Sequence, residues 1–194
     1  ADGRNKKRSL RYRLWRRSNE VIRAISQYII PFSKEKKIKI LDLGCADGLM
    51  INNIANCFST DSVGVELAID LFQLAKKKCP NSRIYNSDIK NLDFLKGEEF
   101  DVIICTAVLE HLENPSSAVR NIENLLSPNG ITVWTVPDPF WENVATAVGH
   151  LEDEQHHHIP NLKELEKLAT QNNLKVIESK KFMSVSYTHL TLPT

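Results

Sequence analysis

Two acidic residues follow short apolar runs, and each precedes a pattern typical of a helix. Asp42 ends the first run and is followed by Gly44 and Gly48, while Glu66 ends the second run. Where a parallel strand ends, a carboxylate can reach a ligand at the sheet edge, and glycines let the backbone turn sharply and approach that ligand closely. A carboxylate at the end of the second strand can accept hydrogen bonds from two ribose hydroxyls. The spacing therefore predicts a binding site for a cofactor that contains a nucleoside.

The glycine spacing distinguishes between classes of such cofactors. A turn that binds a dinucleotide has the pattern Gly-x-Gly-x-x-Gly and places a pyrophosphate at the N-terminus of the following helix. Counting from Gly44, the second and third glycine positions hold Ala46 and Leu49, so this turn does not encode a pyrophosphate site. Two alternatives stay open at this point: a strand, turn and helix that bind no ligand, and a nicotinamide-dependent oxidoreductase.

A continuous apolar run from Phe100 to Thr106 is typical of a strand that is buried on both faces of a parallel sheet. The chain continues as Val-Leu-Glu-His-Leu-Glu-Asn-Pro over 108–115, and residues 126–130 are Leu-Ser-Pro-Asn-Gly. Together with the earlier Asp-x-Gly-x-Ala-x-Gly turn, these motifs resemble class I S-adenosylmethionine-dependent methyltransferases, in particular the small-molecule subfamily that includes ubiquinone-biosynthesis enzymes. The chain departs from the family at Ala46, which replaces the middle glycine, and at Asn129, which replaces a glycine but tolerates a positive φ.

The resemblance covers roughly Lys37 to Met183 and implies that the cofactor is S-adenosylmethionine. It assigns Asp42 to the turn and the methionine end of the cofactor, Glu66 to the ribose, and Asp88, beside Ile89, to the adenine amino group. From its position after a strand alone, Asp88 is more often a turn former or helix cap. The segment after the fourth strand would line the cofactor and face the methyl acceptor. The implied cofactor-binding residues are Asp42, Gly44, Cys45, Ala46, Gly48, Glu66, Leu67, Asp88, Ile89, Thr106, Ala107 and Glu110.

The reaction implied by the resemblance is transfer of a methyl group to oxygen, nitrogen or carbon of a small molecule, such as a lipid, quinone or sugar intermediate. An imidazole titrates near neutral pH and can orient or deprotonate an acceptor hydroxyl, so His111 and His150 are candidate catalytic residues. The consecutive residues His156, His157 and His158 cannot all face one ion, and we predict no metal site. A methyltransferase-like domain that binds a partner without catalysis is a further alternative.

Strand and helix patterns alternate along the chain. This alternation predicts an α/β fold, a Rossmann-like three-layer sandwich with a mostly parallel sheet and helices on both faces. Asn161 is expected to cap a helix in which leucines recur at helical spacing. The final residues, Val185 to Thr194, resemble the in-frame translation of a transposon adapter used in sequencing libraries. We therefore expect residues 184–194 to be a non-native tail and the last strand to be missing. The less favoured alternative, based on their β-rich composition, is a genuine edge strand.

The N-terminal segment, residues 1–33, differs in charge from the methyltransferase-like domain, residues 34–183. Its first 18 residues hold eight Lys or Arg and one acid, whereas the whole chain has a net charge of +1. We expect an amphipathic helix that ends near Pro31, and such a helix could cover the acceptor pocket. A solvated basic end and a peripheral contact with anionic lipid headgroups are both open interpretations. No nucleic-acid partner is expected.

Composition is that of an ordinary globular protein. The chain has 194 residues, of which 42% are hydrophobic and 25% charged, so it can bury a core. No apolar run approaches the ~20 residues that span a bilayer and no signal segment opens the chain, so we expect a cytoplasmic protein. The four cysteines lack metal-ligand or disulfide spacing and are expected to be reduced and structural. Because the chain begins without Met, we interpret it as a fragment of a longer protein.

Overall fold

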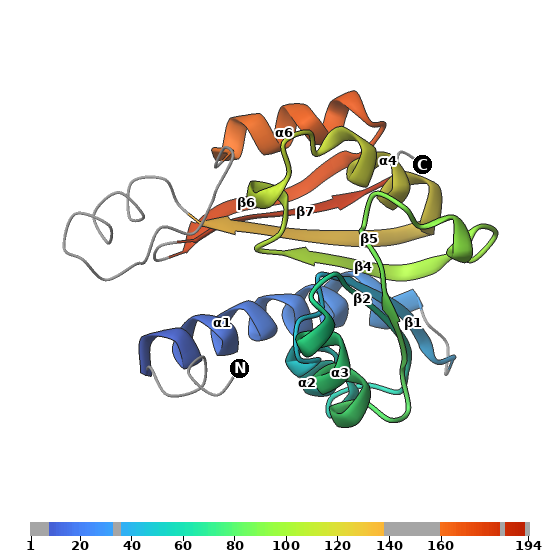
Figure 1. Cartoon of the computed structure of the whole chain (residues 1–194). Coiled ribbons are helices and arrows are strands. Elements are labelled where there is room, and N and C mark those ends of the chain that lie inside the picture. The colour runs from blue at the N-terminus through green and yellow to red at the C-terminus, as the bar shows by residue number, and fades with distance from the viewer. Residues whose placement is uncertain (1–7, 33–35, 138–159, 183–184, 193–194) are drawn as a thin grey trace.

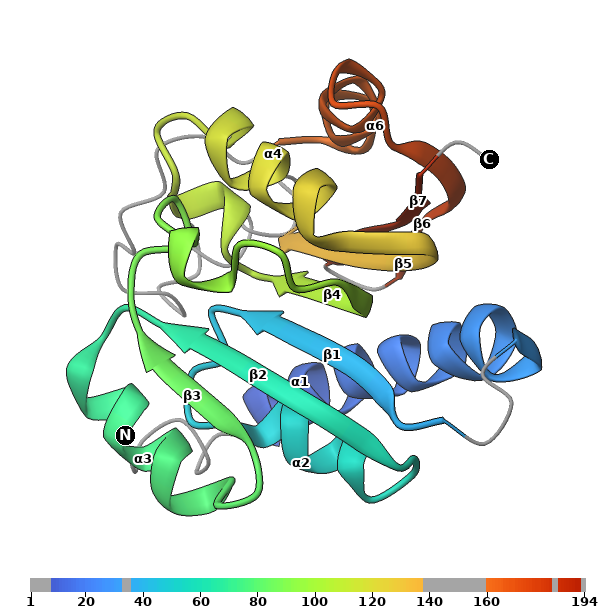
Figure 2. The ribbon, with the colours of Figure 1, turned by 90° about the vertical axis from the view of Figure 1, so that its right-hand side faces the viewer.

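A mixed sheet organises the computed structural model, which describes residues 8–32, 36–137, 160–182 and 185–192. The sheet has seven strands in the order β3-β2-β1-β4-β5-β7-β6 (Figures 1 and 2). Neighbours from β3 to β5 pair in parallel, and β7 pairs antiparallel with both β5 and β6. The strands are β1 (Ile38–Leu43), β2 (Thr60–Glu66), β3 (Arg83–Asn86), β4 (Phe100–Thr106), β5 (Leu126–Pro137), β6 (Lys175–Phe182) and β7 (Val185–Thr191).

Helices cover both faces of the sheet, which confirms the predicted three-layer α/β fold. Figure 1 shows α1, α2 and α3 on one face, and α4 and α6 on the other. Across the described ranges, no helix is long and apolar enough to cross a bilayer. The helices are α1 (Arg8–Ala24), α2 (Leu49–Ala55), α3 (Ile69–Lys78), α4 (Ser116–Leu125) and α6 (Leu162–Gln171), with a π-helical turn at Ile25–Ile29 and 3-10 turns at Ile30–Phe32, Asp93–Leu95 and Leu109–His111.

Apolar side chains form a separate cluster on each face of the sheet. On one face, Ile104 of β4 and Val133 of β5 belong to the same buried cluster as Ile25, which follows α1. On the opposite face, Trp134 of β5 clusters with Ile122 of α4. Burying one such side chain contributes roughly 1.5–3 kcal/mol. The hydrophobic effect therefore fixes the N-terminal helical segment against the sheet, as it does α4.

Polar contacts fix the position of α1 along the sheet. The guanidinium of Arg23 donates to Glu178 Oε2 of β6 at 2.7 Å and to Glu20 Oε2, within α1, at 3.0 Å. Toward the other end of the helix, Asn53 Nδ2 of α2 donates to Ser18 Oγ at 2.9 Å. These contacts connect the beginning of the chain to β6 and α2, so they determine which face of α1 meets the carboxyl end of the sheet.

The expectation that the last strand is missing is wrong for this structure. Residues Val185–Thr191 form β7, which lies between β5 and β6 and is therefore not an edge strand either. Thr188 and Leu190 of β7 are buried. Strands β5 and β6 offer their hydrogen-bonding edges to this β-rich segment, and the pairing with β5, which is far from it in the sequence, is not visible in the local sequence. The adapter-like origin of residues 184–194 stays a prediction.

Two local predictions about turns and caps are confirmed. The side chain of Asn161 accepts hydrogen bonds from the backbone amides of Lys163 and Glu164, and Glu164 Oε2 accepts one from the Asn161 amide at 2.9 Å. This reciprocal pair is a capping box, and it satisfies amides that have no partner within α6. Asn129, which replaces a glycine near the start of β5, adopts a positive φ of +64°.

Candidate functional site

The turn between β1 and α2 depends on its two glycines. Gly44 and Gly48 adopt φ values of +76° and +80°, a region that costs glycine little. A Cβ atom on Gly44 would clash with the side chain of Val108, which follows β4, and one on Gly48 would clash with the thiol of Cys79, which follows α3. The glycines therefore allow the turn to pack closely between the ends of these elements.

Two alanines near the site also have a left-handed backbone. Ala46, at the position of the middle glycine, has a φ of +50°, and Ala107, just after β4, has a φ of +56°. For an alanine this conformation costs roughly 1–2 kcal/mol. Hydrogen bonds hold both residues, since the Ala46 amide donates to Glu66 Oε2 at 2.8 Å and the Ala107 amide to Thr135 O at 2.8 Å. Strain of this kind concentrates at functional sites.

Asp42 is a buried carboxylate with an unsatisfied oxygen. The residue lies near the end of β1 and is 1% exposed. Its Oδ2 atom has no hydrogen-bond partner among the described residues. Burial, followed by the negative charge of Glu66, raises the pKa of Asp42 to about 7. An ionised carboxylate in such surroundings is stable only with a cation or donor nearby. The site therefore favours a ligand with a positive group at this point.

Glu66 connects the turn after β1 to the start of α3. Its Oε2 atom accepts from the Ala46 amide at 2.8 Å, and its Oε1 atom accepts from the Ala68 amide at 2.9 Å. A carboxylate has about four lone-pair positions, so these two bonds leave about two for a ligand. Two hydroxyls of one ribose match that remaining capacity. Leu67, the next residue, is 68% exposed and presents an apolar surface beside the carboxylate.

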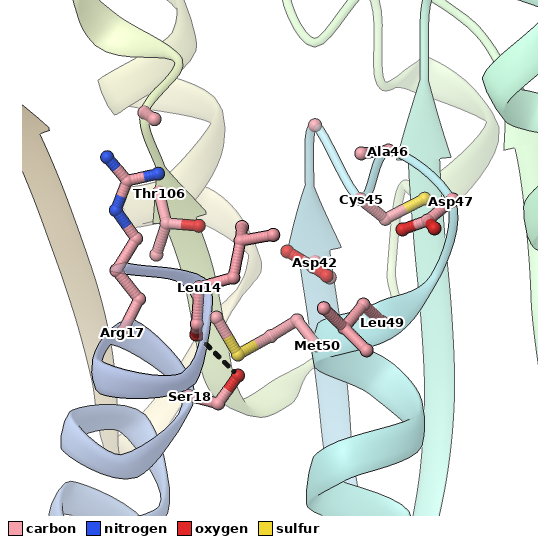
Figure 3. A pocket seen from close by; sticks show the side chains of 12 residues that line it. Leu14, Arg17, Ser18, Asp42, Cys45, Ala46, Asp47, Leu49, Met50 and Thr106 are labelled. Atoms are coloured by element: carbon pink, nitrogen blue, oxygen red, sulfur yellow. Dashed lines mark hydrogen bonds between the residues drawn. The ribbon is translucent and has the colours of Figure 1, made fainter. Parts of the chain in front are cut away.

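Asp42 and the turn after β1 line a pocket at the carboxyl end of β1 and β4, whereas Glu66 and Leu67 are not among its lining residues. The pocket has a volume of about 140 Å³, which is below the roughly 300 Å³ of a small ligand site, so it can enclose only part of a nucleoside-sized ligand. Figure 3 shows residues of α1 on one side and the turn after β1 on the other. The lining residues are Leu14, Arg17, Ser18, Asp42, Gly44, Cys45, Ala46, Asp47, Leu49, Met50, Thr106 and Ala107.

Asp88 and Ile89 lie away from this pocket lining. Asp88 Oδ1 accepts from the Lys90 amide at 2.9 Å, and its Oδ2 atom lies 3.3 Å from Lys90 Nζ. Asp88 thus forms the local turn that was the alternative interpretation of this position, while its oxygens keep further acceptor capacity. Ile89 is 6% exposed and belongs to the core cluster on the α4 face. The adenine role of this pair stays a prediction.

The residues after β4 divide into those at the pocket and those away from it. Thr106 and Ala107 line the pocket. Glu110 is 1% exposed and does not line it, whereas the side chain of His111 is exposed on the same 3-10 turn. The second catalytic candidate, His150, lies outside the described residues. Neither histidine assignment is tested by this arrangement.

Cysteines contribute to the site through packing. All four are free thiols, and Cys45 lines the pocket. Burial, followed by the charges of Asp42 and Glu66, raises the pKa of the Cys45 thiol above its usual value. The thiol therefore stays protonated and unreactive at neutral pH, in agreement with the expected structural role.

Sequence reasoning missed the residues that α1 and α2 bring to the pocket, namely Leu14, Arg17, Ser18, Leu49 and Met50. The amphipathic pattern predicted a helix that could cover the acceptor pocket. Residues of α1 line the pocket described here, and the role of the helix toward an acceptor stays a prediction. Which side chains face inward depends on contacts such as Arg23 with Glu178, which are 155 residues apart. No local pattern contains that information.

Comparison with known proteins assigns the chain to a family. Residues 12–179 match the family described as "Methyltransferase domain". The chain belongs to this methyltransferase family. Among curated relatives, a ubiquinone biosynthesis O-methyltransferase of Glaesserella parasuis is 33% identical over 101 residues, covering 48% of this chain and 42% of the relative. A malonyl-[acyl-carrier protein] O-methyltransferase of Halalkalibacterium halodurans is 28% identical over 118 residues, covering 57% and 44%.

Solved structures agree with the family through their fold. An S-adenosylmethionine-dependent methyltransferase from Clostridium acetobutylicum aligns with a TM-score of 0.71 and 14% identity over 91% of each chain. The magnesium protoporphyrin IX methyltransferase of Synechocystis PCC 6803, solved with bound SAH, aligns with a TM-score of 0.69 and 14% identity over 98% of each chain. These likenesses confirm the predicted Rossmann-like methyltransferase fold. The chain spans less than half the length of the two curated relatives described above.

Proposed function

We propose that this methyltransferase domain binds S-adenosylmethionine and transfers its methyl group to a small molecule. The observation that carries the proposal is Asp42, a buried carboxylate with a partnerless oxygen at the pocket. The methionine end of the cofactor carries an ammonium group, and a charge-assisted hydrogen bond from it would satisfy this oxygen. A phosphate-containing cofactor would place negative charge there instead, so the nicotinamide alternative fits less well.

Each part of the cofactor has a matching group on the chain. Asp42 would accept from the ammonium, the remaining lone pairs of Glu66 from the ribose hydroxyls, and the turn with Gly44 and Gly48 would lie against the ligand. When bound, S-adenosylmethionine supplies a methyl group activated by its sulfonium. The residues of this chain orient the ligand, exclude water and stabilise its charge, which is where most of the catalytic contribution of such a domain lies.

The acceptor is proposed to be a small molecule. The relatives named above are O-methyltransferases of ubiquinone biosynthesis and of malonyl-[acyl-carrier protein], which supports acceptors of low molecular weight or carried groups. His111 and His150 stay proposed bases for an acceptor hydroxyl. Contact of the basic N-terminal segment with anionic lipids, and a cytoplasmic location, also stay proposals.

Calorimetric titration tests the cofactor assignment. S-adenosylmethionine, S-adenosylhomocysteine and NAD are titrated into the wild-type protein and into Asp42→Asn, with Asp61→Asn as the matched control. Asp61 is exposed at the opposite end of β2, so its substitution leaves the site intact. Loss of a charged hydrogen bond of about 1.5–3 kcal/mol predicts roughly 10- to 100-fold weaker S-adenosylmethionine binding by Asp42→Asn alone. Binding of NAD in preference to the other two ligands, or no binding by folded wild-type protein, would overturn the proposal.

A non-catalytic domain is the second candidate function, because Ala46 departs from the family motif. It predicts normal cofactor binding without any turnover. Release of S-adenosylhomocysteine from S-adenosylmethionine, measured with a broad panel of acceptors, separates the two functions.

A further inference from the structure

We infer that two asparagines, Asn86 of β3 and Asn121 of α4, are positioning residues for the nucleoside part of the cofactor. Asn86 positions Glu66 for the ribose, and Asn121 positions Asp88 for the adenine. The inference rests on the proposed function and on the predicted adenine role of Asp88, because it concerns the same cofactor.

Asn86 holds the backbone that follows Glu66. It ends β3, the edge strand beside β2 (Figure 2), and Glu66 is its register partner. Its Nδ2 atom donates to Glu66 O and to Leu67 O, each at 2.8 Å, which matches the two N–H donors of a side-chain amide. A carbonyl of the β2–α3 connection is thus fixed by a side chain from another strand.

The same connection holds the Glu66 carboxylate. The Leu67 carbonyl and the Ala68 amide belong to one peptide group, and the Ala68 amide donates to Glu66 Oε1 at 2.9 Å. Because a peptide group is planar, a hydrogen bond that fixes its carbonyl also fixes the direction of its N–H. Asn86 therefore fixes the donor that orients the Glu66 carboxylate.

The loop after β3 repeats this arrangement with different residues. Asn121 Nδ2 donates to Ile89 O at 3.0 Å and to Lys90 O at 3.1 Å. The Ile89 carbonyl and the Lys90 amide form one peptide group, and the Lys90 amide donates to Asp88 Oδ1 at 2.9 Å. Asn121 therefore fixes the donor that orients the Asp88 carboxylate, and it does so from α4.

Both arrangements share one physical logic. In each, an asparagine from another element accepts no strain itself but fixes a peptide whose N–H binds an acid two residues earlier in the chain. Without the asparagine, the acid and its loop could rotate together. A hydrogen bond to the carbonyl also polarises the peptide and strengthens the bond that its N–H donates. An acceptor fixed in advance loses less conformational freedom when a ligand binds.

The asparagines act through the acids. Neither lines the pocket, and both N–H donors of each side chain are directed at the backbone. Substituting one asparagine should therefore weaken recognition of the ligand group that its own acid binds. A role in stability alone would instead lower the affinity for every ligand by the same factor.

The test uses three ligands and calorimetric titration of the whole chain. They are S-adenosylhomocysteine, an analogue that lacks both ribose hydroxyls, and an analogue with hydrogen in place of the 6-amino group of adenine. Each analogue removes a hydrogen bond to a carboxylate, so the wild-type protein should bind each at least about tenfold more weakly than S-adenosylhomocysteine. These two ratios measure the preference for the ribose hydroxyls and for the amino group.

The two asparagine variants should change different ratios. We expect Asn86→Ala to lose most of the preference for the ribose hydroxyls and to keep the preference for the amino group, and Asn121→Ala to show the reverse. Each variant removes two hydrogen bonds to backbone carbonyls, so each is the matched control for the other. Asn91→Ala, at an exposed position outside both arrangements, should keep both preferences.

The outcomes distinguish the inference from the proposed function. Asn86 is exposed and Asn121 half-buried, so we expect both variants to fold, which urea unfolding checks. Asn86→Ser and Asn121→Ser, which keep one donor, replace an alanine variant that does not fold. No binding of S-adenosylhomocysteine by folded wild-type protein would overturn the proposed function itself. Wild-type binding with unchanged ratios in both variants, or with an equal fall of both ratios in each variant, would overturn the inference.

Discussion

Replacing Asp42 by Asn should change the stability of the ligand-free protein in a pH-dependent way. Burial and Glu66 raise the pKa of Asp42 from 3.8 to about 7, so its ionisation opposes folding. Because the pKa of Asp42 is higher in the folded than in the unfolded state, proton binding favours the folded state. This stabilisation is fully present below about pH 4 and is lost as the pH rises to about 7. At one decade per 1.36 kcal/mol, the full loss is roughly 4 kcal/mol. An asparagine side chain does not titrate and so avoids this loss.

The pH dependence separates the charge from the new amide. The buried amide that Asp42→Asn introduces adds a cost of roughly 1–3 kcal/mol at every pH, so the variant should be less stable than the wild type near pH 4 and of equal or greater stability at pH 8. Urea unfolding at pH 4, 6 and 8, without ligand, measures the difference in the free energy of unfolding. Asp61→Asn should show a nearly constant difference. A constant difference for Asp42→Asn as well would refute the reasoning, because it would mean that Asp42 ionises as it does in water.

Three further predictions concern the backbone of the site and the attachment of α1. Gly48→Ala combines a left-handed φ with a steric clash, so it should lose more stability than Gly97→Ala, where φ is +87° but the surrounding space is open. Chemical unfolding of Gly97→Ala should show a loss of about 1–2 kcal/mol in the free energy of unfolding. Cofactor binding should weaken only in Gly48→Ala. Ala46→Gly should relieve strain and raise the free energy of unfolding by up to about 1 kcal/mol; a destabilised variant would contradict a strained Ala46. Burial acts to raise the pKa of Glu178, but hydrogen bonds from Arg23 and Lys180 outweigh it and lower that pKa to about 2. The difference in the free energy of unfolding between wild type and Glu178→Gln, measured with urea, should therefore narrow as the pH falls from about 4.5 toward 2. A constant difference would contradict the pairing of Glu178 with Arg23 and Lys180.

The parallel half of the fold could be predicted because its signals are local. Strands β1 and β4 are largely apolar runs, the apolar part of β2 directly precedes Glu66, and Asp42 and Glu66 stand at the predicted strand ends. β7 could not be predicted in the same way. Its residues form a strand because β5 and β6 present edges on both sides. Strand β6 directly precedes β7, but β5 is far from it in the sequence. An adapter-like pattern therefore gave the wrong expectation for the sheet.

The candidate site likewise contains residues that local sequence signals predicted and residues that depend on long-range packing. Residues of the turn after β1 were found from spacing, since glycine and acid positions there follow from backbone geometry. Arg17 and Met50 were missed because their place in the lining arises from the packing of α1 and α2 at the carboxyl end of β1 and β4. The sequence of α1 shows an amphipathic helix, and only contacts with β6 and α2 determine which of its several arginines faces the pocket.

The bonding of Glu66 explains why Asp42 is the more informative residue to substitute. Two backbone amides, those of Ala46 and Ala68, already use part of the Glu66 carboxylate, so Glu66→Ala would release the turn after β1 and the start of α3 as well as remove a ribose contact. Weaker cofactor binding by that variant would follow from either cause. Asp42 makes no such bond through Oδ2, so its loss removes a charge without releasing a backbone segment. A variant of Asp42 that gains stability at pH 8 and loses cofactor affinity would therefore assign the carboxylate to the ligand.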